Sequence, residues 1–307
     1  MPKQIPAPLR GVITAMITPL LDRDTLDVAG LERLIDHLIG GGVNGLFILG
    51  TTGEAPSLSY KTRRDVIDHT CRHTAGRLPV IVGVTDTSFS ETLALARHAA
   101  DAGASALVLA APYYFSASQR ELVSYVQHIA AESPLPIFLY NAPTNTHHVL
   151  AVDTVRKLSE LPKILGLKDS GANMMYFHKM VWAFRDRPDF TLLVGPEELT
   201  AEAVLLGGHG GMCGGSNIDP KPYVDLYKAA AAHDLTKLRP LHDRITQISA
   251  TVYRVTNEDS SYLRCLKGAV ALKGICGDAL TEPFQPLNAT EREQLRRHMV
   301  AAGLLDS

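Results

Sequence analysis

The chain has 307 residues, of which 46% are hydrophobic and 20% are charged, so it carries enough apolar material for a sizeable core. The net charge is -2 and no polybasic run occurs, which argues against nucleic acid or a membrane surface as a partner. The four cysteines lie far apart without a C-x-x-C pair, and no signal-peptide h-region or membrane-length apolar run is present. We therefore expect a soluble cytoplasmic protein with reduced cysteines.

Short apolar runs alternate with segments of helical periodicity along the first 232 residues. Asp27 is a possible N-cap of the first helix, which should end at the glycines of 40–42. The predicted strands are 11–17, 46–49, 80–84, 106–109, 137–140, 164–168, 191–194 and 210–213. The predicted helices are 31–39, 64–73, 90–102, 119–131, 152–161, 173–184, 197–206 and 223–232.

Eight strands that each precede a helix predict a parallel sheet, and the number eight favours a closed barrel over an open doubly wound sheet. Three further helices, 235–255, 260–272 and 290–302, follow without strands between them. We therefore expect an α/β fold, a (β/α)₈ TIM barrel over residues 1–232, with a C-terminal helical extension of the same domain over residues 233–307.

The active site of such a barrel lies at the carboxyl ends of its strands. Polar residues that directly follow the apolar runs should therefore converge on one another. These segments are 50–54, 111–114, 140–145, 168–170, 195–198 and 214–217.

Lys168 ends the apolar stretch that starts at Ile164. Taken alone, such a lysine most often extends its ammonium to solvent. At the mouth of a barrel, the favoured interpretation is that Lys168 is partly desolvated and that its amine attacks a carbonyl carbon. The amine condenses with a ketone to an imine, and the protonated imine accepts the electrons of a breaking carbon–carbon bond.

Residues on neighbouring strands suit this chemistry. Tyr140 could move protons at the substrate as a phenol. Gly50 and Gly53 permit a tight turn, so that hydroxyls and backbone N–H groups of Thr51 and Thr52 could hold a small carboxylate. A 2-keto acid such as pyruvate supplies both the ketone and the carboxylate.

Each of these features has a purely structural alternative. The two threonines can be a turn and a helix cap, and Tyr113 and Tyr114 can be packing or interface aromatics. Glu197 and Glu198 can simply favour the positive end of a helix dipole.

Two other motifs are rejected. The glycines at 40, 42 and 45 match the dinucleotide-binding spacing, but they lie between a helix and the following strand, which is the wrong order. His147, His148 and Cys213 form a poor ligand set, because adjacent residues cannot easily face one ion. We predict no metal and no cofactor other than the covalent imine on Lys168.

In order and spacing, these residues resemble the dihydrodipicolinate synthase / N-acetylneuraminate lyase family, the pyruvate-dependent Schiff-base aldolases. The resemblance covers nearly the whole chain and includes Thr18-Pro19, Gly-Thr-Thr-Gly-Glu at 50–54, Pro-Tyr-Tyr at 112–114, Tyr-Asn-x-Pro at 140–143, Lys168 and the glycine-rich 210–217.

The resemblance implies that Lys168 forms the imine, that Tyr140 moves protons and that Thr51 and Thr52 bind the carboxylate. In the synthase branch a threonine and two tyrosines form a proton relay, which Thr51, Tyr114 and Tyr140 match. The relay tyrosine at Tyr114 is donated there by a neighbouring subunit. A homo-oligomer is therefore expected, namely the tetramer (a dimer of dimers) common in the family.

One departure bears on the substrate. The synthases carry an arginine for the carboxylate of their second substrate where this chain has Asn145, and an amide cannot replace a bidentate cation. The resemblance to sugar-acid lyases implies that Ser170, Glu197 and Glu198 contact substrate hydroxyls. Further candidate pocket residues are Thr144, Asn145, Gly195, Cys213 and Ser216.

These residues favour retro-aldol cleavage of a 2-keto-3-deoxy sugar acid or a 4-hydroxy-2-oxo acid to pyruvate and an aldehyde. Dihydrodipicolinate synthesis, dehydration of a keto-deoxy sugar acid, and a keto-acid sensor without turnover remain as alternatives.

Overall fold

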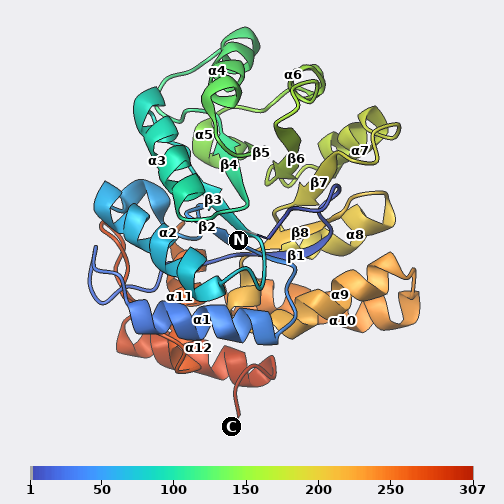
Figure 1. Ribbon diagram of the computed structural model, residues 1–307. Coiled ribbons are helices and arrows are strands. Elements are labelled where there is room, and N and C mark those ends of the chain that lie inside the picture. Colours follow the sequence, from blue (N-terminus) through green and yellow to red (C-terminus); the bar gives the residue numbers. More distant parts are fainter. Residues whose placement is uncertain (1–2, 307) are drawn as a thin grey trace.

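A computed structural model describes residues 3–306 and contains a closed barrel of eight strands. Each strand pairs in parallel with the next, and the last pairs with the first, so the labels run round a ring in Figure 1. The predicted TIM barrel is confirmed. The strands are β1 (Gly11–Ala15), β2 (Gly45–Ile48), β3 (Val80–Gly83), β4 (Ala106–Ala110), β5 (Ile137–Asn141), β6 (Ile164–Asp169), β7 (Thr191–Val194) and β8 (Gly210–Cys213).

The helices follow the strands as predicted, with ends moved by a few residues where a cap decides the boundary. Asp27 does cap the first helix, accepting a hydrogen bond from Gly30 N, whereas Ser59 caps the second one turn earlier than predicted. The helices of the barrel are α1 (Val28–Gly40), α2 (Tyr60–Thr74), α3 (Phe89–Asp101), α4 (Gln119–Glu132), α5 (Pro143–Thr146), α6 (Val152–Leu158), α7 (Met174–Ala183), α8 (Thr200–Leu205) and α9 (Pro220–Ala231).

Two sequence predictions of local structure are wrong, and one helix was not predicted. The first strand ends at Ala15, two residues earlier than expected. The helix predicted over 197–206 is divided into a short 3₁₀ turn, η2 (Glu197–Leu199), and α8. The four-residue helix α5, which follows β5, was not predicted because it is too short to show a periodicity. Two further 3₁₀ turns are η1 (Ala55–Ser57) and η3 (Gly215–Asn217).

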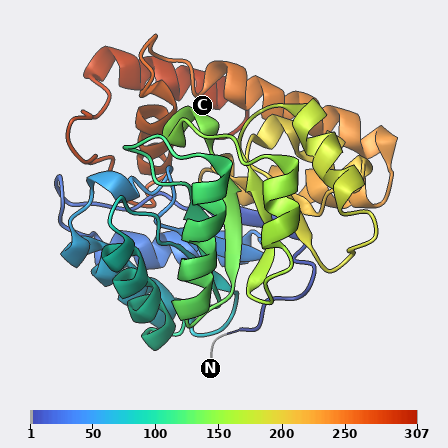
Figure 2. The same ribbon diagram turned by 90° about the horizontal axis from the view of Figure 1, so that it is seen from above.

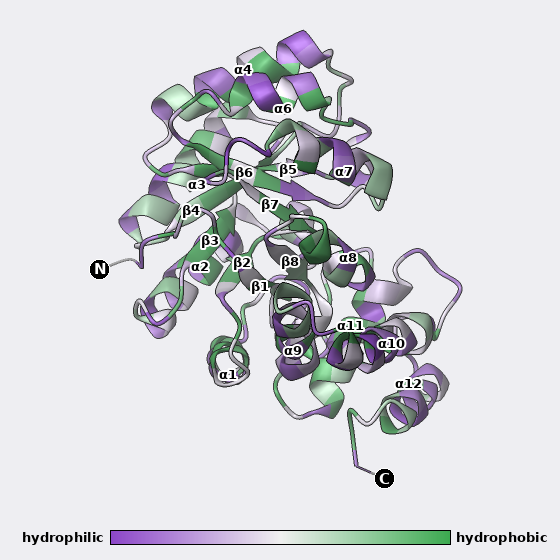
Figure 3. Ribbon diagram, turned by 90° about the vertical axis from the view of Figure 1, so that its right-hand side faces the viewer, coloured by the Kyte–Doolittle hydropathy of each residue, from purple (hydrophilic) through white to green (hydrophobic). Residues whose placement is uncertain are grey.

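The strands separate two hydrophobic layers. Alternate strand residues fill the barrel interior, including Ile13, Phe47, Ile81, Phe138 and Met212, all at most 1% exposed. The other strand residues face outward and pack under the helices. In Figure 3 the strands are accordingly largely hydrophobic, while the outer helices carry hydrophilic residues. The barrel centre is therefore a packed core. Burial of each large apolar side chain there stabilises the fold by about 1.5–3 kcal/mol.

The C-terminal extension consists of α10 (Leu235–Thr251), α11 (Ser261–Leu272) and α12 (Ala289–Ala301). Helix α10 packs on α9 and η2, and α11 packs on η3 and α12. Figures 1 and 2 show these helices, orange to red, gathered on one side of the barrel. The predicted C-terminal helical extension is thus confirmed. The predicted boundary between barrel and extension, at 232/233, falls between α9 and α10 and stays a prediction. Residues 1–2 and 307 of the predicted ranges lie outside the described part.

Within residues 3–306, no helix has both the length and the apolar character needed to cross a membrane.

Candidate active site

Lys168 and Tyr140 are direct neighbours on the paired strands β5 and β6. The Lys168 residue is 4% exposed, and its Nζ lies 4.3 Å from the ring centroid of Tyr140 and 4.8 Å from that of Phe47. None of the ion pairs found among residues 3–306 includes Lys168. The ammonium therefore faces two aromatic rings, an arrangement that attracts a cation without fixing it to a carboxylate.

Tyr140 is buried, and its hydroxyl lies 3.5 Å from Thr51 Oγ1. Burial alone would raise the pKa of the phenol. The charge of Lys168 and hydrogen bonds with Ser170, Thr51 and Lys168 outweigh burial and lower the pKa below its ordinary value. A phenol of this kind can release and regain a proton beside the amine.

The turn after β2 carries the two threonines. Glu54 N donates to Thr51 O at 3.0 Å, Gly53 N donates to Gly50 O at 3.1 Å, and Thr18 Oγ1 donates to Gly53 O at 2.7 Å. This turn exposes Thr51 and buries Thr52. A side chain at position 50 would collide with Phe47, since a Cβ there would lie 2.5 Å from Phe47 Cε1.

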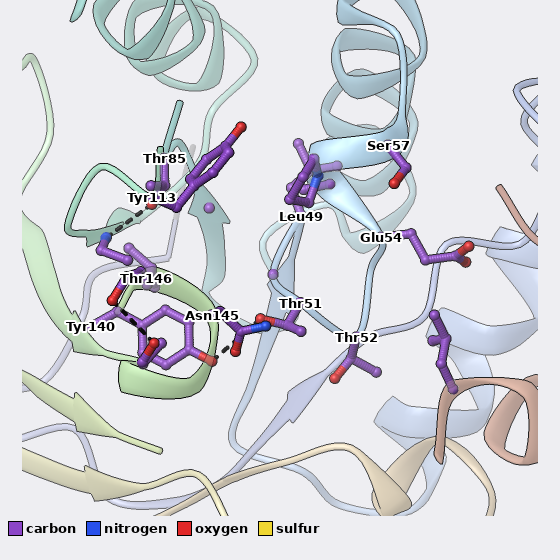
Figure 4. A pocket seen from close by; sticks show the side chains of 18 of the residues that line it. Leu49, Thr51, Thr52, Glu54, Ser57, Thr85, Tyr113, Tyr140, Asn145 and Thr146 are labelled. Carbon is purple, nitrogen blue, oxygen red and sulfur yellow. Dashed lines mark hydrogen bonds between the residues drawn. The ribbon is translucent and has the colours of Figure 1, made fainter. Parts of the chain in front are cut away.

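Two adjoining cavities open at this end of the barrel. One, of about 700 Å³, contains Lys168. The other, of about 480 Å³, has a more apolar lining and is seen in Figure 4, where Thr51, Asn145 and Tyr140 lie close to one another. The two cavities share the residues Thr51, Thr52, Tyr140, Asp259 and Tyr262.

The structure brings most of the predicted site residues to these cavities. Asn145 lines the second cavity. The cavity around Lys168 is lined by the predicted residues Thr51, Thr52, Tyr140, Thr144, Ser170, Gly195, Glu197 and Glu198.

Cys213 does not reach either cavity, which corrects the prediction that it contacts substrate. Side chains alternate along a strand, and on β8 it is Met212 that points into the barrel. Cys213 points outward, where its Sγ lies 3.6 Å from Thr200 Oγ1 and burial raises the pKa of the thiol. Ser216 also lies outside both linings: its hydroxyl donates to Cys213 O at 3.0 Å and lies 3.0 Å from Thr14 Oγ1.

Tyr114 also stays outside the cavities of its own chain. It is 77% exposed and packs edge-to-face on Phe115, which is 78% exposed, with ring centroids 5.0 Å apart. Its neighbour Tyr113 instead lines the second cavity. Within one chain, the Thr51–Tyr140 pair therefore has no contact with Tyr114, and the relay through a neighbouring subunit remains a prediction.

Glu197 lines the Lys168 cavity, but its carboxylate is occupied by protein donors. The hydroxyls of Tyr253 and Tyr223 donate to Oε1 at 2.6 and 3.0 Å, and Gly215 N donates to Oε2 at 2.7 Å. Burial raises the pKa of this carboxyl to about 6. Glu197 thus connects η2 with α9, with η3 and with the segment that follows α10. Glu198 beside it is only half-buried.

The sequence interpretation missed several cavity residues from the C-terminal extension. Tyr262, at the start of α11, lines both cavities, and Arg254 lines the Lys168 cavity. Arg254 is the only basic residue besides Lys168 in these linings, and no ion pair found in the described chain includes it. No local pattern marks these residues, because only the packing of the extension brings them to the barrel mouth.

No group of three or more histidine, cysteine or acidic residues within 3–306 is arranged to hold a metal ion.

A closed (β/α)₈ barrel with a buried lysine beside a tyrosine at the strand ends has the architecture of the Schiff-base lyases. Residues 8–302 match the sequence model of the Dihydrodipicolinate synthetase family, and the chain belongs to that family. It is therefore an enzyme, a lyase of the class I aldolase type.

Known relatives cover almost the full chain. The 4-hydroxy-tetrahydrodipicolinate synthase of Gluconacetobacter diazotrophicus is 31% identical over 97% of this chain and 98% of its own. The solved structure of dihydrodipicolinate synthase from Bacteroides thetaiotaomicron is 50% identical, with a TM-score of 0.95 over 97% of this chain and 100% of that one. YagE, an E. coli K12 prophage protein of the dihydrodipicolinic acid synthase family solved with pyruvate, is 31% identical, with a TM-score of 0.91 over 96% and 99%.

Proposed function

We propose that the enzyme forms an imine between Lys168 and a 2-keto acid, and that it cleaves or makes the carbon–carbon bond that joins a pyruvate unit to an aldehyde. The observation that carries this proposal is the buried Lys168 amine, which lies against the ring of Tyr140 inside a cavity and has no carboxylate partner in the described chain. The YagE structure with pyruvate, a relative 31% identical to this chain, supports it.

In the cleavage direction, the neutral Lys168 amine attacks the keto carbon, and uptake of a proton from solvent with loss of water leaves a protonated imine. Tyr140, as phenolate, takes the proton of the hydroxyl at the fourth carbon. The bond between the third and fourth carbons then breaks, its electrons enter the imine to give an enamine, and the aldehyde departs. Protonation of the enamine at the third carbon and hydrolysis release pyruvate and free Lys168.

Thr51 and Thr52 are proposed to hold the substrate carboxylate through hydroxyl and backbone N–H groups. Thr51 also lies within reach of the Tyr140 hydroxyl, so it can orient the phenol during both proton transfers. No cofactor enters this scheme, because the imine itself supplies the electron sink.

For the substrate, we propose a 2-keto-3-deoxy sugar acid or a 4-hydroxy-2-oxo acid. Asn145 stands on the cavity wall where a carboxylate-binding arginine would be required for the synthase reaction, and an amide binds hydroxyls better than it replaces that cation. Ser170, Thr144 and Glu198 add hydroxyl-binding groups to the wall of the Lys168 cavity.

A second candidate is 4-hydroxy-tetrahydrodipicolinate synthase, and the names of the relatives favour it over the lyase. In this reaction the same enamine attacks an aldehyde that carries a second carboxylate. Arg254 is then the one cavity-lining cation that could meet this carboxylate, from the extension instead of from the turn after β5. A keto-deoxy sugar acid dehydratase would use the same imine without cutting the carbon chain.

We further propose a cytoplasmic homotetramer, a dimer of dimers, in which Tyr114 of one subunit completes the relay of its neighbour. The exposure of the Tyr114–Phe115 pair supports a contact with another copy, because large aromatic side chains are seldom left in water together. The four free, buried cysteines support a reducing compartment.

Borohydride reduction in the presence of pyruvate tests the central proposal. We expect a mass increase on the intact protein that maps to Lys168 after digestion. No adduct, or an adduct at another lysine, would overturn the imine at this position.

Substrate assays then separate the candidates. Pyruvate release from a panel of keto-deoxy sugar acids is expected to be much faster than condensation of pyruvate with aspartate semialdehyde. Efficient condensation would instead identify the synthase, a keto-deoxy product of unchanged carbon number would identify the dehydratase, and trapping of pyruvate without any turnover would identify a sensor.

A further inference from the structure

Glu54 and Lys267 form an ion pair with no exposed side-chain surface on either partner. Glu54 ends the turn that carries Thr51 and Thr52, whereas Lys267 lies in the middle of α11 in the C-terminal extension. The proposed chemistry assigns no role to either residue. In Figure 4 the Glu54 side chain points away from Tyr140 and Thr51, so it is not itself aimed at the reacting groups.

Each charged atom of the pair has hydrogen-bond partners. Lys267 Nζ donates to Glu54 Oε1 and, at 2.6 Å, to Ala279 O. Thr281 donates twice to Glu54 Oε2, from its N and from its Oγ1, each at 2.8 Å. Such burial of two charges is tolerated only when every charged atom has partners, which makes the geometry of the pair highly specific.

The ion pair fixes Glu54, a residue whose backbone conformation is unfavourable. Its φ of 56° is left-handed, a conformation that costs free energy for a residue with a side chain, and Leu49 at the other end of the turn has the same φ. Glu54 N also donates to Thr51 O. Anchoring the Glu54 carboxylate in α11 therefore keeps the turn between Leu49 and Glu54 in one conformation.

A second residue of α11 reaches the same turn. Tyr262, one helical turn and a half before Lys267, lines both cavities, as Thr52 of the turn does. The extension thus reaches the threonine turn at two points: through the buried Glu54–Lys267 pair and through Tyr262 at the cavity surface.

We propose that Glu54 and Lys267 are positioning residues, and that their buried ion pair sets the Thr51–Thr52 turn as the binding site for the keto-acid carboxylate. The proposal rests on the proposed function, since it assumes that a 2-keto acid occupies the cavity. It also gives the C-terminal extension a role in substrate binding and not only in stability.

The test is a pyruvate titration with borohydride trapping, in which the fraction of trapped protein is followed by mass spectrometry. Three variants weaken the anchor in steps: Thr281→Val removes one hydroxyl donor, Glu54→Gln removes one charge, and the double variant E54Q/K267M removes both. Leu295→Ala in α12 is the matched control, because it destabilises the extension without touching the turn: Leu295 is fully buried and packs on Gly268 of α11.

We expect the pyruvate concentration for half-maximal trapping to rise about tenfold in Glu54→Gln and in the double variant, and about threefold in Thr281→Val. Maximal trapping at saturating pyruvate should stay near that of the wild type, since Lys168 is untouched. Leu295→Ala should be less stable but should keep the wild-type half-saturation. If the ion pair only stabilised the fold, the Glu54 variants would behave in the same way as Leu295→Ala.

Folded Glu54→Gln with wild-type half-saturation would overturn the positioning role. If Glu54→Gln does not fold, Thr281→Val decides the matter, because it keeps both charges and the backbone donor. Absence of any adduct in the wild type would instead overturn the proposed function, so the two failures are distinguishable.

Discussion

Lys168 and Lys267 are both buried, but their surroundings differ in the property that decides reactivity. Lys267 is bound by Glu54 and Ala279 O, and its environment is closed on all sides. Lys168 has the rings of Phe47 and Tyr140 against its ammonium, no carboxylate partner in the described chain, and a cavity in front of it.

The difference separates a structural charge from the proposed nucleophile. Burial lowers the pKa of Lys267, but the charge and the hydrogen bond of Glu54 act against this shift, so the ion pair favours the ammonium, which has no lone pair to offer. Lys168 instead has only two aromatic faces against its amine and no carboxylate to hold it as the ammonium. Burial alone therefore does not distinguish the proposed catalytic lysine from Lys267, whereas the partners of each amine do.

The largest expected effect comes from Lys168→Met, which should abolish both pyruvate trapping and turnover. Lys168 is the only lysine in the two cavity linings of the described chain, and the guanidinium of Arg254 cannot take its place as an amine nucleophile. Mass spectrometry after borohydride reduction measures the first and a pyruvate-release assay measures the second. Labelling of Lys267 in this variant would show that the contrast between the two lysines is false.

Tyr140→Phe should lower kcat by about 10²–10⁴-fold, the usual contribution of a general acid–base group, while imine trapping persists. The ring stays, so the contact with the Lys168 ammonium is kept and only the proton carrier is lost. Steady-state kinetics beside trapping of the same preparation separates the two. Equal loss of both would assign Tyr140 to imine formation instead of proton transfer.

Lys267→Met should lower the free energy of unfolding by about 3–5 kcal/mol, because it leaves the Glu54 carboxylate buried without its cation. The double variant E54Q/K267M should recover much of this loss, since it removes both charges. Urea unfolding measures the three proteins. Lys61→Met, which breaks an exposed pair with Asp65, is the control and should leave stability nearly unchanged. A Lys267→Met protein as stable as the wild type would contradict the structural role.

The smallest effect concerns a second contrast, between buried carboxylates. Glu54 has a cation as partner, whereas Glu197 has the hydroxyls of two tyrosines, and burial raises its pKa from 4.5 to about 6. A carboxyl with a raised folded pKa binds its proton more tightly when folded. Its stabilising contribution is thus present below pH 4.5 and is lost as the pH rises through about 6.

This loss amounts to about 2 kcal/mol across that window. Glu197→Gln removes the titration, so the stability of the variant relative to the wild type should improve by this amount between pH 4 and pH 7.5. Urea unfolding at both pH values measures the difference. A difference that stays constant with pH would mean that Glu197 titrates alike in the folded and unfolded chains.

Much of the architecture follows from local patterns. Eight apolar runs, each followed by a helical period, were sufficient to predict the closed barrel, because strand and helix periods are properties of neighbouring residues. Once the barrel is assumed, residues that directly follow strands must meet at its mouth. Lys168, Tyr140 and Thr51 could be placed together for this reason.

The errors arose where orientation or distant packing decides. On the short, glycine-rich β8, no alternation tells whether Met212 or Cys213 points inward, and the register with β1 settles it in favour of Met212. Glu197 was expected to meet substrate hydroxyls, but the hydroxyls of Tyr223 in α9 and of Tyr253, two residues beyond α10, both donate to its Oε1. Those tyrosines are separated from it by 26 and 56 residues, beyond any local pattern.

The sequence by itself therefore determined the barrel and the candidate nucleophile, since both depend on periodicity and on strand ends. Only the tertiary structure decided that Lys267 is paired and Lys168 is not, because the Glu54–Lys267 contact joins residues 213 positions apart. A lysine in an apolar segment has the same local signature in both cases, and the partner that packing supplies determines whether its amine is held or left to react.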